Sequence, residues 1–192
     1  LSHEMRTPLT TILGWTELLL ARSNTQDIQH RGLSVISSSA DTLRRLISDM
    51  LDLSGMLMGK LYLEMQPVNL SEALREAATA LDGGERAAPP PIALELPPED
   101  VWVLGDCPRL RQVFWNLLSN ARKFTSQGSD GRIALTLSAS TENCVVSVSD
   151  NGAGIALEFL PHLFERFRQA DASTTRRHGG LGLGLAIVQQ LV

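Results

Sequence analysis

The first candidate for chemistry is His3, in the run SHEMRTPL, with Glu4 beside it and Thr7 one helical turn later. A free imidazole has a pKa of about 6.5 and is mostly neutral at pH 7, so one ring nitrogen can act as a nucleophile. Glu4 could accept a hydrogen bond from the other ring nitrogen and fix the tautomer. The alternative is an incidental histidine on a solvated helix face.

A second candidate group is the pair Asn116 and Asn120, four residues apart and close to Lys123. This spacing places them on one face of a helix. Amide oxygens suit Mg²⁺ without repelling a triphosphate, and the lysine can offset phosphate charge. Taken alone, such a pair is also common on polar helix surfaces.

A third candidate is Asp150, which ends the run CVVSVSD and is followed by Gly152 and Gly154. A carboxylate at a strand end can accept a hydrogen bond from the exocyclic amine of adenine, and glycines allow the ring to approach closely. Asp-Asn-Gly also favours an ordinary turn, which is the alternative.

A glycine-rich run spans residues 179–184 and leads into a predicted final helix. The free N–H groups at such a helix start suit phosphate, although the run is not a GxxxxGK[ST] loop. The polar, pattern-free stretch 169–184 predicts a mobile lid. We expect Phe164 and Phe167, before this stretch, to anchor the core.

Two helices must position His3. Apolar residues recur at helical spacing from Leu1 to about Ala21, which predicts an amphipathic helix with His3 facing solvent, bent near Pro8. After the polar break 23–26, a stripe from Ile36 to Leu57 predicts a second, antiparallel helix. A lone hairpin buries little surface, so we expect a homodimer that forms a four-helix bundle.

The other candidates lie beyond Gly59, where the pattern changes to an α/β layered unit with one sheet against a few helices. Overall the fold class is α+β. The predicted elements are a strand in LYLEM (61–65), a helix over 70–81 with Ser71 as N-cap, a loop over 83–91, strands over 92–96 and 101–106, a helix over 108–125, and a hairpin of strands 133–140 and 144–150 that turns near Glu142 and Asn143.

The composition of the chain excludes several classes of protein and ligand. The 192 residues are 43% hydrophobic and 20% charged, which excludes general disorder and allows one or two modest cores. A net charge of −4 without a basic block argues against duplex nucleic acid as a ligand. Cys107 and Cys144 suit free thiols in a reducing cytoplasm. No apolar run approaches the length of a membrane span, so we expect no membrane contact from these residues. We interpret the sequence as a fragment of a longer parent protein, which could itself be membrane-anchored.

The order of five motifs decides between these alternatives. SHEMRTPL, NLLSNARKFT, DNGAGI, FERF and GLGLGLAIV together resemble the sensor histidine kinases of two-component signalling, over essentially the whole chain. The resemblance implies a dimerisation and histidine-phosphotransfer hairpin over residues 1–58. It also implies an incomplete catalytic ATP-binding domain of the gyrase, Hsp90, kinase and MutL type over 59–192.

The resemblance also implies roles for individual residues. His3 is the expected phosphoacceptor, Glu4 its orienting acid, and Thr7 the hydroxyl that positions water for dephosphorylating the partner. ATP and Mg²⁺ are the expected cofactors, with Asn116 and Asn120 as the metal ligands. The expected nucleotide-binding residues are Asn116, Asn120, Lys123, Asp150 as the adenine contact, Gly152, Gly154, and the lid glycines Gly180, Gly182 and Gly184.

The expected activity is ATP-dependent autophosphorylation of His3, followed by transfer to an Asp of a response-regulator receiver domain. Many family members carry Arg at the position of Gln169, so Arg168, Arg176 and Arg177 all remain candidates for contacting the γ-phosphate. The run FRQAD is closer to hybrid kinases. One alternative is a catalytically silent dimeric scaffold, which the intact candidate residues argue against. The other is an ATP-driven clamp, which the SHEMRTPL hairpin argues against.

Overall fold

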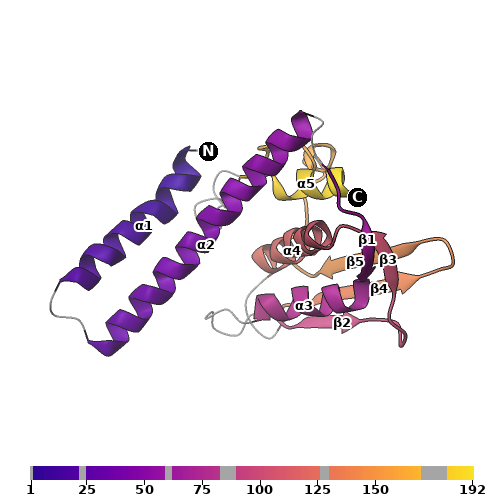
Figure 1. The fold of residues 1–192 in the computed structure, drawn as a ribbon, viewed down its shortest axis with the longest axis horizontal. Coiled ribbons are helices and arrows are strands. Elements are labelled where there is room, and N and C mark those ends of the chain that lie inside the picture. Colours follow the sequence, from indigo (N-terminus) through magenta and orange to yellow (C-terminus); the bar gives the residue numbers. More distant parts are fainter. Residues whose placement is uncertain (1, 22–24, 59–61, 83–89, 126–129, 170–180) are drawn as a thin grey trace. The chain divides into compact units, whose positions relative to one another are not determined.

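The computed structural model describes residues 2–21, 25–58, 62–82, 90–125, 130–169 and 181–192 (Figure 1). These residues form two compact units, a helical hairpin that extends to residue 58 and an α/β unit that begins at Tyr62. Residues 181–183 group with the hairpin, and residues 184–192 with the α/β unit.

The hairpin consists of α1 (Ser2–Leu20) and α2 (Gln26–Leu57), which run antiparallel as predicted (Figure 1). Gly32 lies where the two helices pack closely. A Cβ atom added there would lie 2.9 Å from side-chain atoms of both Trp15 and Leu19. The missing side chain therefore allows α1 to approach α2.

The buried face of α2 repeats every seven residues, at Gly32, Ser39, Leu46 and Leu53. The predicted stripe from Ile36 to Leu57 was offset from this face: it includes Ala40, which is exposed, and Ile47, which is 46% exposed. The reason is that α2 is apolar on two adjacent faces, and periodicity alone does not tell which one the same chain covers. Other large apolar side chains exposed on the hairpin are Leu9, Leu13, Leu18, Leu20, Ile28, Leu33, Leu51 and Met58.

The α/β unit confirms the α+β class, but its strands form two sheets instead of the single sheet expected. Strands β2 (Ile92–Glu95), β4 (Ile133–Ala139) and β5 (Cys144–Asp150) form one sheet, with β2 parallel and β5 antiparallel to β4. Strands β1 (Gln66–Asn69) and β3 (Trp102–Gly105) pair separately and antiparallel. Alternation predicts an extended segment but not its partner.

The start of this unit differs from the prediction in two further ways. The run LYLEM is not a strand, because pairing begins only at Gln66. Helix α3 (Leu70–Asp82) is capped by Asn69, whose Oδ1 accepts from the Glu72 N–H at 3.1 Å, and not by Ser71. Ser71 is fully buried, and its Oγ accepts from the Val101 N–H at 3.1 Å.

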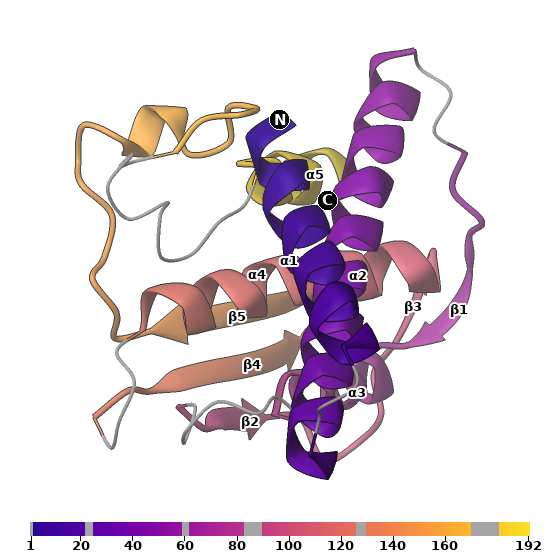
Figure 2. The same cartoon turned by 90° about the vertical axis from the view of Figure 1, so that its left-hand side faces the viewer.

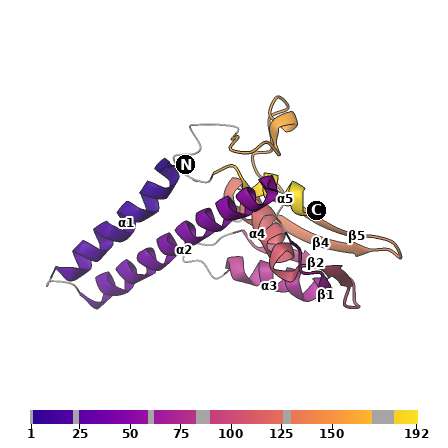
Figure 3. The same cartoon turned by 45° about the horizontal axis from the view of Figure 1, so that its top comes forward.

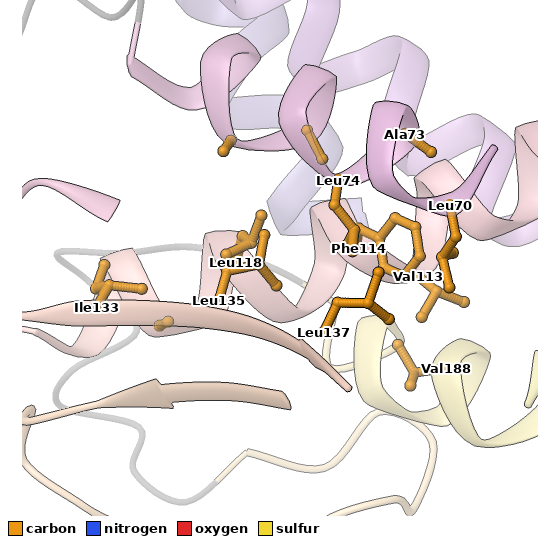
Figure 4. Packing of buried hydrophobic residues seen from close by; sticks show 13 residues of the cluster. Leu70, Ala73, Leu74, Val113, Phe114, Leu118, Ile133, Leu135, Leu137 and Val188 are labelled. Atoms are coloured by element: carbon orange, nitrogen blue, oxygen red, sulfur yellow. The ribbon is translucent and has the colours of Figure 1, made fainter. Parts of the chain in front are cut away.

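The core lies between the three-stranded sheet and the helices α3 and α4 (Cys107–Phe124), which cover the same face of that sheet (Figures 2 and 3). Ile133, Leu135 and Leu137 alternate along β4 toward these helices, as a half-buried strand requires. Helix α5 (Gly184–Leu191) adds Val188. Figure 4 shows Leu118 of α4 and Leu135 in this cluster, so α4 is fixed by packing along its length.

We expect Leu118→Ala to lower the free energy of unfolding of the α/β unit by about 2–5 kcal/mol, because it leaves a cavity at a fully buried position. Leu104→Ala is the matched control. Leu104 is 68% exposed, so its truncation is expected to cost less than about 0.5 kcal/mol. Denaturant unfolding measures both, and equal losses would contradict this description of the core.

Candidate functional site

Helix α4 carries three of the predicted site residues. Its first turn is capped by Asp106, whose Oδ1 accepts from the Arg109 N–H at 3.1 Å. Its last turn is closed by Thr125, whose N–H and Oγ1 both donate to the Ala121 carbonyl, at 3.0 and 2.7 Å. At about 100° per residue, positions 116, 120 and 123 fall within one face, turned away from buried Leu118. The three side chains of that face, Asn116, Asn120 and Lys123, are half-buried.

The middle of this face is contacted by the start of α5. The Asn116 Nδ2 group donates to the Gly184 carbonyl at 3.2 Å. A Cβ atom at Gly184 would lie 3.4 Å from Asn116 Oδ1. Such a contact is close to an ordinary van der Waals distance, so Gly184 lies directly against the Asn116 amide, and the hydrogen bond fixes which way the amide points.

The C-terminal end of α4, at Phe124, is contacted by the loop after β5. The Gly152 N–H donates to Asp150 Oδ1 at 2.8 Å, and the Ala153 N–H donates to the Phe124 carbonyl at 3.2 Å. A Cβ atom at Gly152 would lie 2.4 Å from that same carbonyl oxygen, a distance that no side chain tolerates. The loop can approach α4 only because residue 152 is glycine. Asp150 itself is exposed.

Asn151 was not predicted as part of the site, yet it holds this loop in place. Its Oδ1 accepts from the Arg132 N–H at 2.7 Å, and its Nδ2 donates to the Asp130 carbonyl at 2.7 Å. These partners lie 19 and 21 residues away. The Asp-Asn-Gly turn signal marks the position, but local sequence does not reveal partners so distant.

Two of the predicted glycines have an unusual backbone conformation. Gly154 and Gly182 have φ angles of 70° and 66°, a left-handed conformation that favours glycine. Gly180 lies outside the described residues, as do Arg176 and Arg177 and most of the predicted lid.

The segment before the lid disagrees with the prediction. Phe164 and Phe167 are 42% and 57% exposed, so they do not anchor the core. The segment is organised by local contacts: His162 Nδ1 lies 2.7 Å from Glu165 Oε1, and Arg168 donates to Glu165 Oε2 at 2.7 Å. The hydrogen bonds from His162 and then Arg168 hold the pKa of the Glu165 carboxyl below its ordinary value. Arg168 is thus engaged with a carboxylate in this structure.

His3 lies in the first turns of α1 and is exposed, as predicted. The Thr7 hydroxyl donates to the His3 carbonyl at 3.2 Å, which places Thr7 one turn along the same face. A shallow hollow beside His3 is also lined by Arg6, Thr10 and Thr11, which the sequence had not singled out. Glu4 is half-buried, and its orienting role stays a prediction.

Among the described residues, no group of three or more His, Cys, Asp or Glu side chains gathers as a metal site. Among the helices of that part of the chain, none combines the length and apolarity that crossing a membrane requires.

The chain thus combines a helical hairpin that bears an exposed histidine with an α/β unit in which amides and glycine loops lie along one helix. Residues 1–56 match the His Kinase A (phospho-acceptor) domain, and residues 105–192 match the histidine kinase-, DNA gyrase B- and HSP90-like ATPase family. The chain belongs to the sensor histidine kinases, and it contains an ATP-binding domain of that family.

Similar proteins agree with this assignment. The chain is 40% identical to the signal transduction histidine-protein kinase BarA of Escherichia coli, over all of this chain and 21% of BarA. It is also 40% identical to the probable sensor histidine kinase TcrY of Mycobacterium tuberculosis, over 39% of TcrY. The chain thus spans only a minor part of these relatives.

Solved structures show the same fold. Full-length ShkA in complex with AMPPNP matches with a TM-score of 0.66 and 34% identity, over 99% of this chain and 39% of ShkA. Histidine kinase ThkA in complex with the response regulator TrrA matches with a TM-score of 0.61 and 25% identity, over 100% of this chain and 52% of ThkA.

We expect Gly152→Ala to destabilise the α/β unit by about 1–3 kcal/mol, because the new Cβ would overlap the Phe124 carbonyl and force the loop away from α4. Loss of hydrogen-exchange protection at the Ala153 amide would report this movement. Gly55→Ala is the control: no atom lies within 4 Å of a Cβ at this position in α2, so the change should be neutral or stabilising. An unchanged Ala153 amide in the Gly152 variant would contradict the argument.

Proposed function

We propose that this chain is the catalytic part of an ATP-dependent protein-histidine kinase that phosphorylates its own His3 and passes the phosphoryl group to an Asp of a receiver domain. Residues 1–58 would form the dimerisation and phosphotransfer hairpin, and residues 59–192 the ATP-binding domain. The observation that carries the proposal is the face of α4, whose amides lie between two glycine contacts, Gly184 on Asn116 and Gly152 on Phe124.

This face suits a nucleotide along its length. From Asn116 to Phe124 the helix rises by about 12 Å. At one end Asp150 has one oxygen bound to the Gly152 N–H, and we assign its second oxygen to the exocyclic amine of adenine. At the other end Asn116 and Asn120 lie where phosphates would follow, with Lys123 as a cation on the same face. Gly154, Gly180 and Gly182 complete the proposed contacts.

The same amides fit Mg²⁺. The hydrogen bond to Gly184 fixes the NH₂ group of Asn116, which leaves the amide oxygen as the atom presented to a cation. Magnesium prefers such hard oxygen ligands and keeps phosphate oxygens and water as its others. When bound, the ion would neutralise phosphate charge. Asn116 and Asn120 would hold it without adding negative charge of their own.

His3 supplies the nucleophile. A neutral ring nitrogen attacks the γ-phosphorus in line, the new N–P bond forms, the bond from the γ-phosphorus to the bridging oxygen breaks, and ADP leaves with the electron pair. Exposure of His3 lets it meet the donor and later the acceptor. Glu4 would hold the tautomer, and Thr7, one turn away, would position water when the regulator is dephosphorylated.

The surface of the hairpin supports the proposal of a homodimer. Leu33, Ala40 and Ile47 recur every seven residues on the exposed face of α2, and Leu9 and Leu13 are exposed on α1. Such stripes are the pattern that a coiled-coil seam requires. A second hairpin would cover them and complete a four-helix bundle. The His Kinase A domain itself implies dimerisation.

The receiver domain is proposed from the relatives. Hybrid signal transduction histidine kinase D of Dictyostelium discoideum is 36% identical over all of this chain and 12% of its own length. ThkA was solved with a response regulator. An acidic receiver pocket would take the phosphoryl group from phospho-His3, since a phosphoramidate is a good phosphoryl donor. We place this reaction in the cytoplasm, and the parent protein could be membrane-anchored.

We expect His3→Gln to abolish incorporation of label from γ-labelled ATP, because glutamine keeps the polarity of the side chain but has no nucleophilic ring nitrogen. His30→Gln is the control, since His30 is also an exposed histidine of the hairpin. The label should be acid-labile and base-stable. Its persistence in His3→Gln would refute His3 as acceptor, and its absence from the wild-type parent protein that still binds ATP would favour the silent scaffold.

We expect Asp150→Asn to weaken ATP binding by about ten- to a hundredfold, because the amide keeps an acceptor for the Gly152 N–H but turns an NH₂ donor toward the adenine amine. Asp150→Ala should abolish binding. Calorimetry with ATP and inosine triphosphate measures both affinities, and preference for ATP should shrink in Asp150→Asn. The dimer should persist in sedimentation. Retained ATP affinity would exclude the adenine role.

A further inference from the structure

An arginine lies beside His3 on the exposed surface of α1. Arg6 follows His3 by three residues and both are exposed, so their side chains are neighbours on the helix. Both also line the hollow that Thr7, Thr10 and Thr11 share. A group bound to the His3 ring would therefore lie within reach of the Arg6 guanidinium.

Arg6 has no carboxylate at the positions of α1 that could pair with it. Side chains pair along a helix at spacings of three and four residues, and two residues apart they do not face each other, which excludes Glu4. The positions at the pairing spacings hold no acid: Ser2, His3, Leu9 and Thr10. Every arginine of α2, by contrast, lies three or four residues from an aspartate: Arg31 from Asp27, Arg44 from Asp41, and Arg45 from Asp41 and Asp49. Within α1, the Arg6 guanidinium therefore has no anionic neighbour.

Two hydroxyls of the same surface already use their hydrogens. Thr7 Oγ1 donates to the His3 carbonyl at 3.2 Å, and Thr11 Oγ1 donates to the Thr7 carbonyl at 3.0 Å. A hydroxyl has one hydrogen, so these two groups offer only lone pairs to a ligand. A phosphoryl group carries three acceptor oxygens and therefore needs donors. The Arg6 guanidinium supplies several N–H donors in a planar fork that matches the geometry of phosphate.

We propose that Arg6 binds the phosphoryl group that His3 carries after phosphorylation, with paired N–H groups donating to two of its oxygens. This inference rests on the proposed role of His3 as phosphoacceptor. The negative charge that appears on phosphorylation lies three residues from a cation, so contact with Arg6 stabilises the phosphorylated form relative to the free histidine. The contact also holds the phosphoryl oxygens in one orientation for the next transfer.

The contact can be tested without nucleotide. Phosphoramidate phosphorylates exposed imidazoles: a ring nitrogen attacks phosphorus, the new N–P bond forms, and ammonia leaves with the electron pair of the old bond and takes up the proton that the ring releases. In the full chain treated in this way, NMR of the Arg6 Nε–H group should show a new chemical shift and exchange with water slowed by about two- to fivefold. The slowing should diminish at high salt, because an exposed ion pair is screened.

His30 provides a matched control, because it is also an exposed histidine of the hairpin. In His3→Gln, phosphoramidate can still modify His30, and the Arg6 Nε–H signal should stay unchanged. An Arg6 signal that does not respond to phosphorylation of His3, or that changes equally in His3→Gln, would overturn the proposal.

A second measurement uses the phosphorylation equilibrium with ATP and ADP at fixed concentrations, where the ratio of phospho-His3 to free His3 does not depend on rates. Arg6→Gln should lower this ratio by about two- to fivefold, Arg6→Lys should lower it less, and Arg31→Gln should leave it unchanged. An unchanged ratio in Arg6→Gln would show that Arg6 does not stabilise phospho-His3.

The two measurements separate failure of this proposal from failure of the kinase proposal. If ATP labels His3 but the Arg6 signal does not respond to phosphorylation, the kinase proposal stands and the Arg6 proposal fails. If the Arg6 signal responds to chemical phosphorylation but ATP never labels His3, only the kinase proposal fails.

Discussion

The structure of the α/β unit depends on how α4 is held. Leu118 and its neighbours on the buried face pack against β4 and α3, so the opposite face, with Asn116 and Asn120, is presented at a defined angle. Because the helix is rigid and both of its ends are capped, loops that contact it are placed relative to one another. Gly152 and Gly184 contact the same helix eight residues apart, at Phe124 and Asn116. The packing of α4 therefore determines the spacing between these two glycine contacts.

The hairpin differs from the α/β unit because part of its apolar surface is exposed. Its helices are apolar on two adjacent faces, and the chain covers only one of them, with Gly32 allowing the close approach of α1. An exposed stripe of this kind costs free energy in water and is stabilised when a second hairpin covers it. His3 avoids that conflict because it lies on the polar face of α1. His3, the proposed phosphoacceptor, would therefore stay exposed if a second hairpin covered the apolar stripe.

Sequence predicted the elements better than their partners. Both hairpin helices, α4 and the β4–β5 pair were predicted because each follows from local periodicity. The division into two sheets was not predicted, and neither were the cap at Asn69 nor the distant partners of Asn151. The sheets and the Asn151 contacts depend on partners 19 or more residues away. The cap depends on a competition between two polar residues two positions apart, Asn69 and Ser71. The prediction that Phe164 and Phe167 are buried is wrong for a related reason. An aromatic residue is buried only where other parts of the chain cover it.

The structure also explains why each motif alone is weak evidence for a nucleotide site, whereas their order along the chain is specific. Asn116, Asp150 and Gly184 each have an ordinary structural explanation, and Asn116 does make a structural hydrogen bond to Gly184. That bond does not compete with a binding role, because it uses the NH₂ group and leaves the oxygen. Asp150 is similar, because its Oδ1 accepts from the Gly152 N–H and its Oδ2 takes no part in that hydrogen bond. Each side chain uses one polar atom to fix its own orientation, and the other atom can then meet a ligand without first being ordered.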